Sequence, residues 1–537
     1  MSSNLSNISG KKGLEENLFE ELGISAKEKG HPSVEEMEKL ADQFIFGKAN
    51  VFGAASFYDF LKPDNQGKKV YICNGSACLT AGTQPKLREE LLKKYLPEEI
   101  GEMCCLGKCY EAQGLNVEGL EFNDSVPLNP QLSTFNNNIL TRDFPGTELY
   151  YGLWKKVLKT SKEELLNELK ISGLRGRGGA GFPIATKLEA CLQARGDKKF
   201  IVCNADEGDP GAFSDRYLLE ERIHSVLLGM MIAGFITGAS YGVMYIRGEY
   251  PRAISICKNA MEELKQFQHT GQNIHGSGFD FQFKLIAAQG AYICGEETAL
   301  LSSIEGQRPE VRVRPPYPVH QGLFNKPTVV NNVETLACVP FIIEKGGAIF
   351  AKMGRGRSTG TKLVSLDSHF NRPGLYEVEM GTPLSALIYE MAGGFRIPVK
   401  ALHIGGPLGG LVPVSRINDL TIDFESFSEH GFLLGHASVV CIPEDFPMIQ
   451  YLEHLFRFTA HESCGKCFPC RIGSTRGYEM LEKAQKEGYK IDLVLFNDLL
   501  ETLEIGSLCA LGGGLPLPVK NALQYFENEL STYFKNA

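Results

Sequence analysis

The feature that most constrains this chain is a glycine-rich stretch at residues 173–183, which reads GLRGRGGAGFP. Glycine gives a core no side chain and loses the most backbone entropy on folding, so this density indicates positive φ angles or a backbone that approaches a ligand closely. Arg175 and Arg177 add positive charge, and free backbone N–H groups add donors, which together suit an anion such as phosphate. The stretch therefore predicts a phosphate-binding loop, with a flexible surface loop as the alternative.

The spacing Gly176-x-Gly178-x-x-Gly181 fits the dinucleotide-binding fingerprint, which requires a strand directly before it. Residues 161–170 (SKEELLNELK) predict a helix instead. We therefore expect a phosphate cradle in a non-standard Rossmann setting, with Lys187 placed to reach the phosphate.

Three short apolar segments predict strands at residues 199–203, 239–246 and 281–288, with helical segments between them. This alternation predicts a mainly parallel sheet. Ligands bind at the carboxyl ends of the strands in such sheets. The polar residues that directly follow the first strand are therefore candidates for a binding site; they are Asn204, Asp206, Glu207 and Asp209.

Length and charge narrow the class of protein. A chain of 537 residues predicts several domains. A net charge of −9 argues against nucleic acid as a partner. No apolar run is long enough to span a bilayer, and the first residues lack the apolar region of a signal peptide. We expect a cytoplasmic protein, peripheral where it serves a membrane complex, in which the fifteen cysteines do not form disulfides and those with suitable spacing bind metal clusters.

Four cysteines form a first group, Cys73-x4-Cys78 and Cys105-x3-Cys109, with each pair expected in a loop. Four thiolates suit the soft iron of a [2Fe–2S] cluster. A zinc site or free thiols are the alternatives, but these spacings differ from the two-residue spacing of a zinc knuckle. Cys104 could compete as a ligand, and the spacing favours Cys105.

A second group reads Cys464-x2-Cys467-x2-Cys470. Three thiolates on one tight loop are typical of a [4Fe–4S] cluster, whose fourth ligand comes from elsewhere in the chain. Cys509 is the only later cysteine, so we expect it to be that ligand, with zinc as the alternative. The other cysteines have no paired spacing and are interpreted as structural thiols; they are Cys191, Cys203, Cys257, Cys294, Cys338 and Cys441.

The first cysteine group, together with residues 52–58 (FGAASFY), resembles the thioredoxin-like [2Fe–2S] subunit of respiratory complex I. The interval from Cys78 to Cys105 is shorter than in that family. This resemblance implies a thioredoxin-like fold around the first cluster.

Most of the chain resembles a second family. The glycine stretch, residues 204–216, residues 290–298 (GAYICGEET) and residues 330–335 (VNNVET) are similar to motifs of the flavoproteins that include the NADH-oxidising subunit of complex I. The same family includes the diaphorase subunits of NAD-linked hydrogenases and formate dehydrogenases. The resemblance implies FMN as cofactor and NAD(H) as substrate.

The resemblance also implies which residues bind. The flavin would lie against Gly176, Arg177, Gly178, Gly179, Gly181, Lys187, Asn204, Asp206, Glu207, Tyr292, Gly295, Glu296, Asn331, Asn332 and Thr335. The nicotinamide nucleotide would lie by Phe182, Asp209, Glu296 and Glu297, and its adenosine half by Arg314 and Tyr317. No side chain is expected to act as a nucleophile; Glu207 and Glu297 would orient the cofactors.

Three positions depart from complex I. Asp209 replaces a common glutamate, and Arg314 and Tyr317 stand where complex I tends to have lysine and phenylalanine. The sequence of the acidic segment, residues 206–211 (DEGDPG), is more similar to the hydrogenase and formate dehydrogenase branch of the family. Acidic residues beside the nucleotide would disfavour a 2′-phosphate, so we expect NADH over NADPH, although Arg314 acts in the opposite direction.

The expected fold is an α/β multidomain chain with a Rossmann-like FMN domain. We expect a helical bundle at 1–66, a thioredoxin-like [2Fe–2S] domain at 67–125, a linker at 126–147, the FMN/NADH-binding domain at 148–355, a ubiquitin-like (SLBB) insert at 356–440 and a helical [4Fe–4S] domain at 441–537. Ser33, with Glu36 three residues later, predicts a helix start within the bundle. The insert, assigned by resemblance, is expected to support the flavin domain and carry no chemistry.

The expected function is that of an NADH:acceptor oxidoreductase subunit, a diaphorase. It would pass hydride between NAD(H) and FMN, and single electrons through its clusters to the iron–sulfur subunits of a hydrogenase, a formate dehydrogenase or a complex I-like assembly. The alternative is a flavin-based bifurcating subunit that couples NAD(H) and ferredoxin. A scaffold that has lost FMN would not keep an intact glycine stretch, and a stand-alone dehydrogenase would leave the cluster motifs without a purpose.

Overall fold

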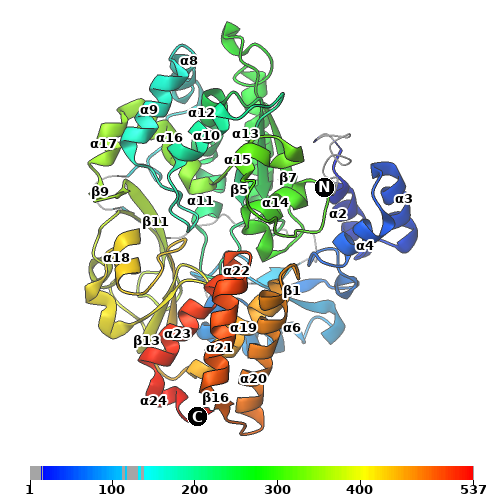
Figure 1. The fold of residues 1–537 in the computed structure, drawn as a ribbon, viewed down its shortest axis with the longest axis vertical. Coiled ribbons are helices and arrows are strands. Elements are labelled where there is room, and N and C mark those ends of the chain that lie inside the picture. Colours follow the sequence, from blue (N-terminus) through cyan, green and yellow to red (C-terminus); the bar gives the residue numbers. More distant parts are fainter. Residues whose placement is uncertain (1–13, 15, 112–114, 118–130, 135–137, 536–537) are drawn as a thin grey trace.

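The computed structural model describes residues 14, 16–111, 115–117, 131–134 and 138–535. Figure 1 shows an α/β region at the top, N-terminal helices at its right-hand edge, a β-rich region at lower left and a helical C-terminal region at the bottom. Within the described residues, no helix combines the length and apolar character that a membrane crossing requires.

A four-stranded parallel sheet forms the centre of the α/β region. Its strands are β5 (Phe200–Ala205), β6 (Tyr241–Ile246), β7 (Gln282–Ala287) and β8 (Thr328–Asn332), in the order β7-β6-β5-β8. The three strands expected from the apolar segments are confirmed, and β8 is an addition. The prediction of a parallel sheet is also confirmed.

Helices cover this sheet, and the helix expected before the glycine stretch is present as α9 (Lys162–Ser172), capped by Ser161. The most buried helix is α12 (Ile223–Thr237), which is apolar on all sides, as expected for a helix enclosed in a core. It packs against α16 (Val333–Lys345) so closely that a methyl group on Gly229 would lie 2.0 Å from the Leu336 carbonyl oxygen.

The N-terminal helices α2 (Leu18–Lys29), α3 (Val34–Phe44) and α4 (Lys48–Ala55) cover one side of the α/β region. Ser33 and Glu36 form the expected capping box at the start of α3. The Asn17 side-chain amide donates to the Ile304 carbonyl (2.9 Å), and the Tyr58 hydroxyl to Ser303 (3.0 Å). The helices therefore share a core with the sheet domain, and residues 1–13 of the expected bundle lie outside the described part.

The first cysteine group belongs to a small sheet of β1 (Val70–Cys73), β2 (Ile100–Met103) and β3 (Leu115–Val117), in the order β2-β1-β3. The first two strands are parallel, and β3 is antiparallel to β1. Helices α5 (Ser76–Ala81) and α6 (Gln84–Leu91) connect β1 to β2. Residues 118–125, at the expected end of this domain, lie outside the described residues.

The expected insert at 356–440 is a β-rich region whose sheet extends beyond both expected limits. The sheet order is β14 (Gly410–Pro413), β13 (Val399–Ile404), β15 (Ser438–Pro443), β11 (Thr361–Leu366), β12 (Gly374–Glu379) and β4 (Gln131–Thr134).

Two boundaries are therefore corrected. Strand β15 crosses residue 440, because its backbone continues to pair with β13 as far as Pro443. Strand β4, within the expected linker 126–147, adds to β12 in parallel, and a helix (Thr147–Tyr150) begins at the end of that linker. Residues 126–130 and 135–137 of the linker are not described.

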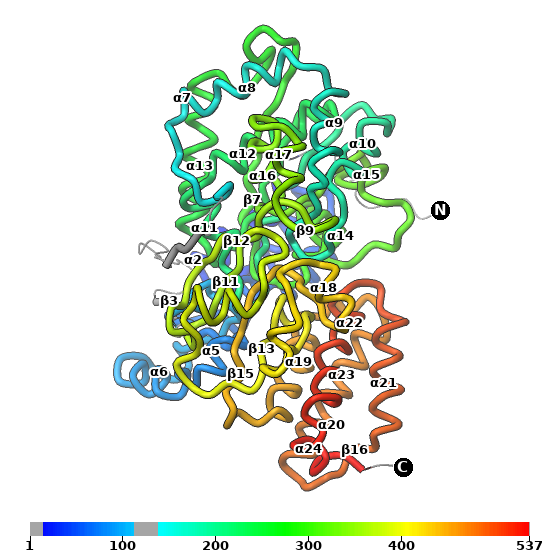
Figure 2. Tube along the Cα trace, turned by 90° about the vertical axis from the view of Figure 1, so that its left-hand side faces the viewer, coloured from blue at the N-terminus to red at the C-terminus, as the bar shows by residue number. Residues whose placement is uncertain are grey.

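The C-terminal region is helical, as expected, and lies to the lower right of the insert in Figure 2. It comprises α19 (Met448–Glu462), α20 (Ser474–Lys486), α21 (Leu493–Gly506), α22 (Ala510–Gly514), α23 (Pro516–Tyr525) and α24 (Glu527–Leu530). The second cysteine group lies between α19 and α20, and Cys509 directly precedes α22. The cysteines of this group are therefore placed by helix ends.

Replacing Gly229 with alanine should destabilise the protein, because the added methyl would meet a backbone atom of α16. Overpacking of this kind costs about 1–3 kcal/mol or more. Gly53→Ala is the matched control, since a methyl there meets no atom within 4 Å and helical alanine is favoured over glycine. Thermal unfolding should show a lower midpoint for Gly229→Ala alone; equal midpoints would contradict the packing described.

Candidate functional site

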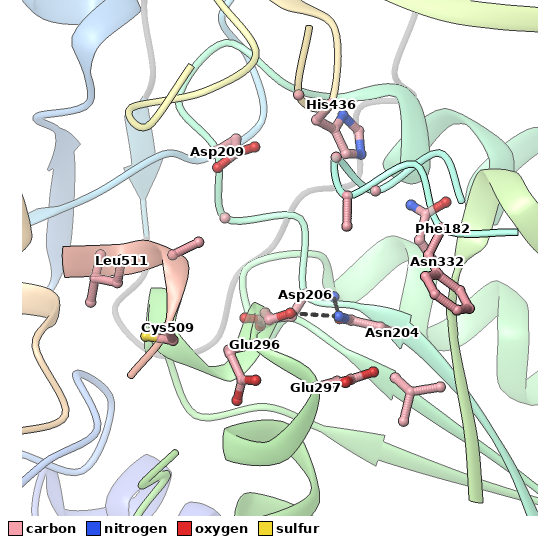
Figure 3. Close-up of a pocket in the computed structure, with 18 of the residues that line it drawn as sticks. Phe182, Asn204, Asp206, Asp209, Glu296, Glu297, Asn332, His436, Cys509 and Leu511 are labelled. Carbon is pink, nitrogen blue, oxygen red and sulfur yellow. Dashed lines mark hydrogen bonds between the residues drawn. The ribbon is translucent and has the colours of Figure 1, made fainter. Parts of the chain in front are cut away.

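A cavity of about 810 Å³ lies at the carboxyl ends of β5 and β8. This volume is within the range of small-molecule and cofactor sites. Its walls come from the sheet domain, the insert and the C-terminal region (Figure 3). The predicted residues that line it are Gly178, Gly179, Phe182, Lys187, Asn204, Asp206, Glu207, Asp209, Tyr292, Gly295, Glu296, Glu297, Arg314, Tyr317, Asn332 and Cys509.

The glycine loop brings bare backbone to the cavity wall. Gly179 has φ +120°, a conformation that L side chains rarely adopt. A methyl group on Gly178 would lie 3.0 Å from Cβ of Asn332, so the loop also touches the end of β8. The N–H of Gly176 donates to the Phe182 carbonyl (2.8 Å) and holds the loop closed. Gly176 and Gly181 shape the loop without lining the cavity.

The two arginines of the loop do not face the cavity, which corrects the expectation for Arg177. Its guanidinium is 0% exposed and donates to the Thr359 carbonyl (2.5 Å) and to the sulfur of Met380 (3.0 Å). Arg175 forms an ion pair with Glu425 (2.5 Å). All three partners belong to the insert, so both arginines attach the loop to the insert.

Polar groups after β5 form one wall. The side-chain amide of Asn204 donates to the Gly295 carbonyl (2.8 Å). Burial raises the pKa of Asp206 well above its usual value, and its Oδ2 is buried with no hydrogen-bond partner within the described structure. An acceptor of this kind fits a hydroxyl or N–H donor on a bound molecule.

Glu207 caps a helix from inside the wall. Its carboxylate accepts the backbone N–H groups of Asp215 (2.8 Å) and Arg216 (3.1 Å) at the start of α11 (Ser214–Glu221), and the hydroxyl of Tyr250 (3.2 Å). Burial, together with the charge of Asp215, raises the pKa of Glu207 to about 7. Its main role is to fix this loop.

The other predicted acids are also held in place. Asp209 accepts the Tyr292 hydroxyl (2.7 Å). Glu296 caps α14 (Glu297–Ile304) by accepting the N–H groups of Thr298 and Ala299, each at 2.8 Å.

Glu297 sits between two cations near the mouth of the cavity. Lys187 approaches one of its oxygens (3.2 Å) and Arg314 the other (3.1 Å). Phe182 and Tyr317 are 47% and 54% exposed, although both line the cavity. Two exposed aromatic rings at the rim of a cavity suit the stacking of a flat ligand.

The segment 330–335 contributes mainly through Asn332. Its side-chain oxygen caps α16 by accepting the Thr335 N–H (3.0 Å), while its Nδ2 donates to the Asp215 carboxylate (2.9 and 3.0 Å). Thr335 accepts the Arg177 N–H (2.8 Å) and does not line the cavity; neither does Asn331.

Sequence reasoning missed the contribution of the insert, which supplies part of the cavity wall rather than support alone. Its lining residues are Gly405, Leu408, Leu433, Gly435 and His436. Residues 405–410 (GGPLGG) carry the same glycine density that marked the first loop, so a signal was present. Asp215 was also missed as a lining residue.

The second cysteine group assembles against the cavity. Cys464 and Cys470 are buried, and Cys467 and Cys509 pack against the same core cluster. Burial raises the pKa of Cys509 to about 12, and the charges of Glu296, Cys464 and Cys470 add to this effect. The four thiols thus form a donor set that fits a [4Fe–4S] cluster, and Cys509 also lines the cavity.

The thiols of the first cysteine group also lie close together, within each of its two pairs. The Sγ atoms of Cys105 and Cys109 are 3.6 Å apart, and a hydrogen bond from Cys78 lowers the pKa of Cys73 to about 6. The backbone N–H of Gly211 donates to Cys109 Sγ (3.2 Å), so this group touches the loop that follows Asp209.

The position of the first pair corrects the expectation that it lies in a loop. Cys73 ends β1, and Cys78 is in α5. Cys104, next to Cys105 in the chain, lines a small cavity shared with Asp206 and Glu462. This placement supports Cys105 as the ligand.

A cavity lined by bare glycine backbone and by Cys509, one of four clustered thiols, suits an organic cofactor beside a metal cluster. Comparisons with known proteins specify the class. Residues 169–341 match the Nuo51 FMN-binding domain, and residues 450–533 match the NADH-ubiquinone oxidoreductase-F iron-sulfur binding region.

Two relatives illustrate the family. The NADP-reducing hydrogenase subunit HndC of Solidesulfovibrio fructosivorans is 42% identical over 394 residues, which cover 73% of this chain and 80% of that protein. The mitochondrial NADH dehydrogenase [ubiquinone] flavoprotein 1 of Dictyostelium discoideum is 35% identical over 387 residues, which cover 71% of this chain and 81% of that protein.

The structure is similar to a chain of the NAD+-reducing [NiFe]-hydrogenase in its H2-reduced state, with a TM-score of 0.82 and 27% identity over 97% of this chain and 93% of that one. The chain therefore belongs to the family of Nuo51-type flavoproteins. It is an oxidoreductase subunit with an FMN-binding domain and a C-terminal [4Fe–4S] region.

Gly179→Ala should lower the amount of flavin that the purified protein retains, because a side chain at φ +120° shifts the loop that lines the cavity. Gly271→Ala is a matched control with the same φ of +120° and open space around it, and Gly271 does not line the cavity. Both variants carry a similar backbone strain of about 1–3 kcal/mol. The flavin-to-protein ratio should fall for Gly179→Ala alone, and equal ratios would argue against the loop as a cradle.

Proposed function

We propose that this chain is a diaphorase that exchanges electrons between NAD(H) and a hydrogenase-type partner. The observation that carries the proposal is that Cys509 and the glycine loop line the same cavity. A flavin held there lies beside a ligand of the [4Fe–4S] cluster. Likeness to the NAD+-reducing [NiFe]-hydrogenase chain over 97% of the present chain, and to the hydrogenase subunit HndC, supports this partner, and a complex I-like assembly is the alternative because the mitochondrial flavoprotein 1 is also similar.

When bound, FMN accepts the two electrons of a hydride together and releases them one at a time. The residues of this chain bind and orient. The bare backbone of Gly178 and Gly179 would hold the anionic end of the cofactor. Asn204, held by Gly295, and the unpartnered Oδ2 of Asp206 line the middle of the cavity.

The nucleotide enters past Phe182 and Tyr317. Glu297 is the acidic group of the mouth, and Lys187 and Arg314 hold its carboxylate in place with two positive charges against its one negative charge. NADH is the proposed substrate because the chain is similar to a chain of an NAD+-reducing hydrogenase.

The first cysteine group is proposed to hold a [2Fe–2S] cluster in a thioredoxin-like domain. Four buried or nearly buried thiols within one small sheet-and-helix unit support this, as does the contact between Cys109 and Gly211. The structural likeness to the hydrogenase chain extends over this N-terminal part, since it covers 97% of the present chain. The cluster serves as a store or a second exit for electrons.

The insert is proposed to be ubiquitin-like. Its mixed sheet with a short helix, α18 (Phe424–Glu429), fits that assignment.

An apolar surface beside the [4Fe–4S] cysteines is proposed as the partner's docking site. Phe468 (66% exposed) and Ile505 (76% exposed) are its most exposed members. Close contact between Gly506 and Pro469 joins α21 to the cysteine loop. Exposed apolar groups gathered near a redox centre are typical of an interaction surface.

Anaerobic NADH should bleach the flavin absorbance and produce a paramagnetic cluster signal. Cys467→Ala should keep the bleaching, lose the [4Fe–4S] signal and retain only about two of six irons per chain. Cys191→Ala, which removes a buried lone thiol, is the control and should match the wild type. The proposal fails if NADH changes neither the absorbance nor the paramagnetic signal.

Ile505→Asp should weaken binding of the native partner by at least about 10-fold, because a charge would enter an apolar interface. Val494→Asp, at the opposite end of the same helix and 53% exposed, is the matched control. Anaerobic co-purification followed by mass spectrometry measures the loss and identifies the partner. NADH-dependent dye reduction should be unchanged in both variants; equal partner recovery would remove Ile505 from the docking surface.

The alternative function is electron bifurcation between NAD(H) and ferredoxin. It predicts that turnover requires ferredoxin and NAD together, whereas a diaphorase turns over with NAD(H) and one acceptor.

A further inference from the structure

Three buried titratable side chains meet at one end of the cavity. Glu207, Asp215 and His436 each place a polar atom within 4.8 Å of the others. Nε2 of His436 is 3.4 Å from Asp215 Oδ2 and 3.8 Å from Glu207 Oε1. His436 comes from the insert, about 220 residues along the chain from the two acids.

Both acids already accept hydrogen bonds from other groups, so the histidine is the residue of the three that remains available to a bound molecule. Glu207 accepts the backbone N–H groups of residues 215 and 216. Asp215 accepts the amide of Asn332 at both oxygens. Burial opposes a charge on His436, yet the Asp215 carboxylate outweighs it and raises the pKa of His436 to about 9. A cationic imidazole beside two occupied carboxylates does not form a metal site.

The other nitrogen of the imidazole has no partner among the described residues. Nδ1 of His436 is buried and makes no hydrogen bond to any described residue, and the side chain is only 7% exposed. His436 also lines the cavity. A buried charged donor without an acceptor is costly, so this nitrogen requires one from a bound molecule.

The acceptor lies at the glycine-loop end. A methyl group on Gly179 would be 3.7 Å from Gly435 and 4.0 Å from the backbone N of His436. Figure 3 shows His436 and Asn332 toward one end of the pocket, and Cys509 and Glu296 toward the other. The flavin ring must be near Cys509 to pass electrons to the cluster. The opposite end of the cofactor, which carries the phosphate, then lies at Gly179 and His436.

We propose that His436 donates a hydrogen bond from Nδ1 to the terminal phosphate of the bound flavin, with Asp215 as the positioning residue. This rests on the proposed function of the cavity as a flavin site. The insert thereby supplies a cation to this end of the cavity. The glycine loop does not supply one, because Arg175 and Arg177 both face the insert. Lys187, the other candidate, is held by Glu297 and the Val330 carbonyl.

The test compares FMN with riboflavin, which lacks only the phosphate. The full-length chain is depleted of flavin and titrated with each, with flavin fluorescence as the readout. His436→Ala should weaken FMN binding by about 10- to 100-fold, the effect of losing a charge-assisted hydrogen bond, and leave riboflavin binding unchanged. His436→Gln, which keeps a neutral donor, should give a smaller loss of FMN alone. His430→Gln, in the same insert but away from the cavity, should change neither.

Each other outcome has a distinct meaning. Equal losses of FMN and riboflavin would show a structural role for His436 and overturn the proposal, as would unchanged FMN binding. A weaker affinity for NADH with unchanged FMN binding would assign the anion to the nucleotide's pyrophosphate and also overturn it. Failure of the wild type to bind either flavin would instead refute the proposed function. The cluster absorbance of each variant reports that the protein is folded.

Discussion

Two backbone segments of the insert cross at Gly405 and Gly435 without room for a side chain on either. A methyl on Gly405 would lie 2.5 Å from the Leu434 carbonyl oxygen, and one on Gly435 would lie 2.3 Å from the Gly405 oxygen. Both glycines line the cavity, so this crossing sets the position of one wall. Next to it, a methyl on Gly406 would lie 2.4 Å from the Asp209 carboxyl, which ties the insert to the loop after β5.

The insert is fastened to the sheet domain by buried charged groups. The fully buried pair of Lys362 and Glu334 joins β11 to α16, and Arg177 joins the glycine loop to the Thr359 carbonyl. A buried ion pair adds little net stability, but removing one partner is costly. Such contacts therefore favour one position of the insert against the sheet domain over other positions. A cofactor site whose walls come from both domains requires that the two domains keep one relative position.

Much of the site could be predicted from the sequence, because its signals are local. Apolar runs located β5, β6 and β7, and cysteine spacing grouped the thiols that the structure brings together. Arg177 shows the limit of such reasoning, because charge in a loop says nothing about which way the side chain turns. His436 belongs to no local motif and reaches the cavity only through the fold of the insert. Strand β4 is too short and polar to stand out, and it exists through pairing with β12.

The claim that the cavity lies next to the [4Fe–4S] cysteines can be tested by the order in which the two clusters are reduced. The full chain is mixed anaerobically with one equivalent of NADH and frozen at successive times for low-temperature electron paramagnetic resonance. Because Cys509 lines the cavity, the cluster of Cys464, Cys467, Cys470 and Cys509 should be reduced as fast as the flavin is reoxidised, before the cluster of the first cysteine group. A [2Fe–2S] signal that appears first, with the [4Fe–4S] cluster still oxidised, would contradict this arrangement.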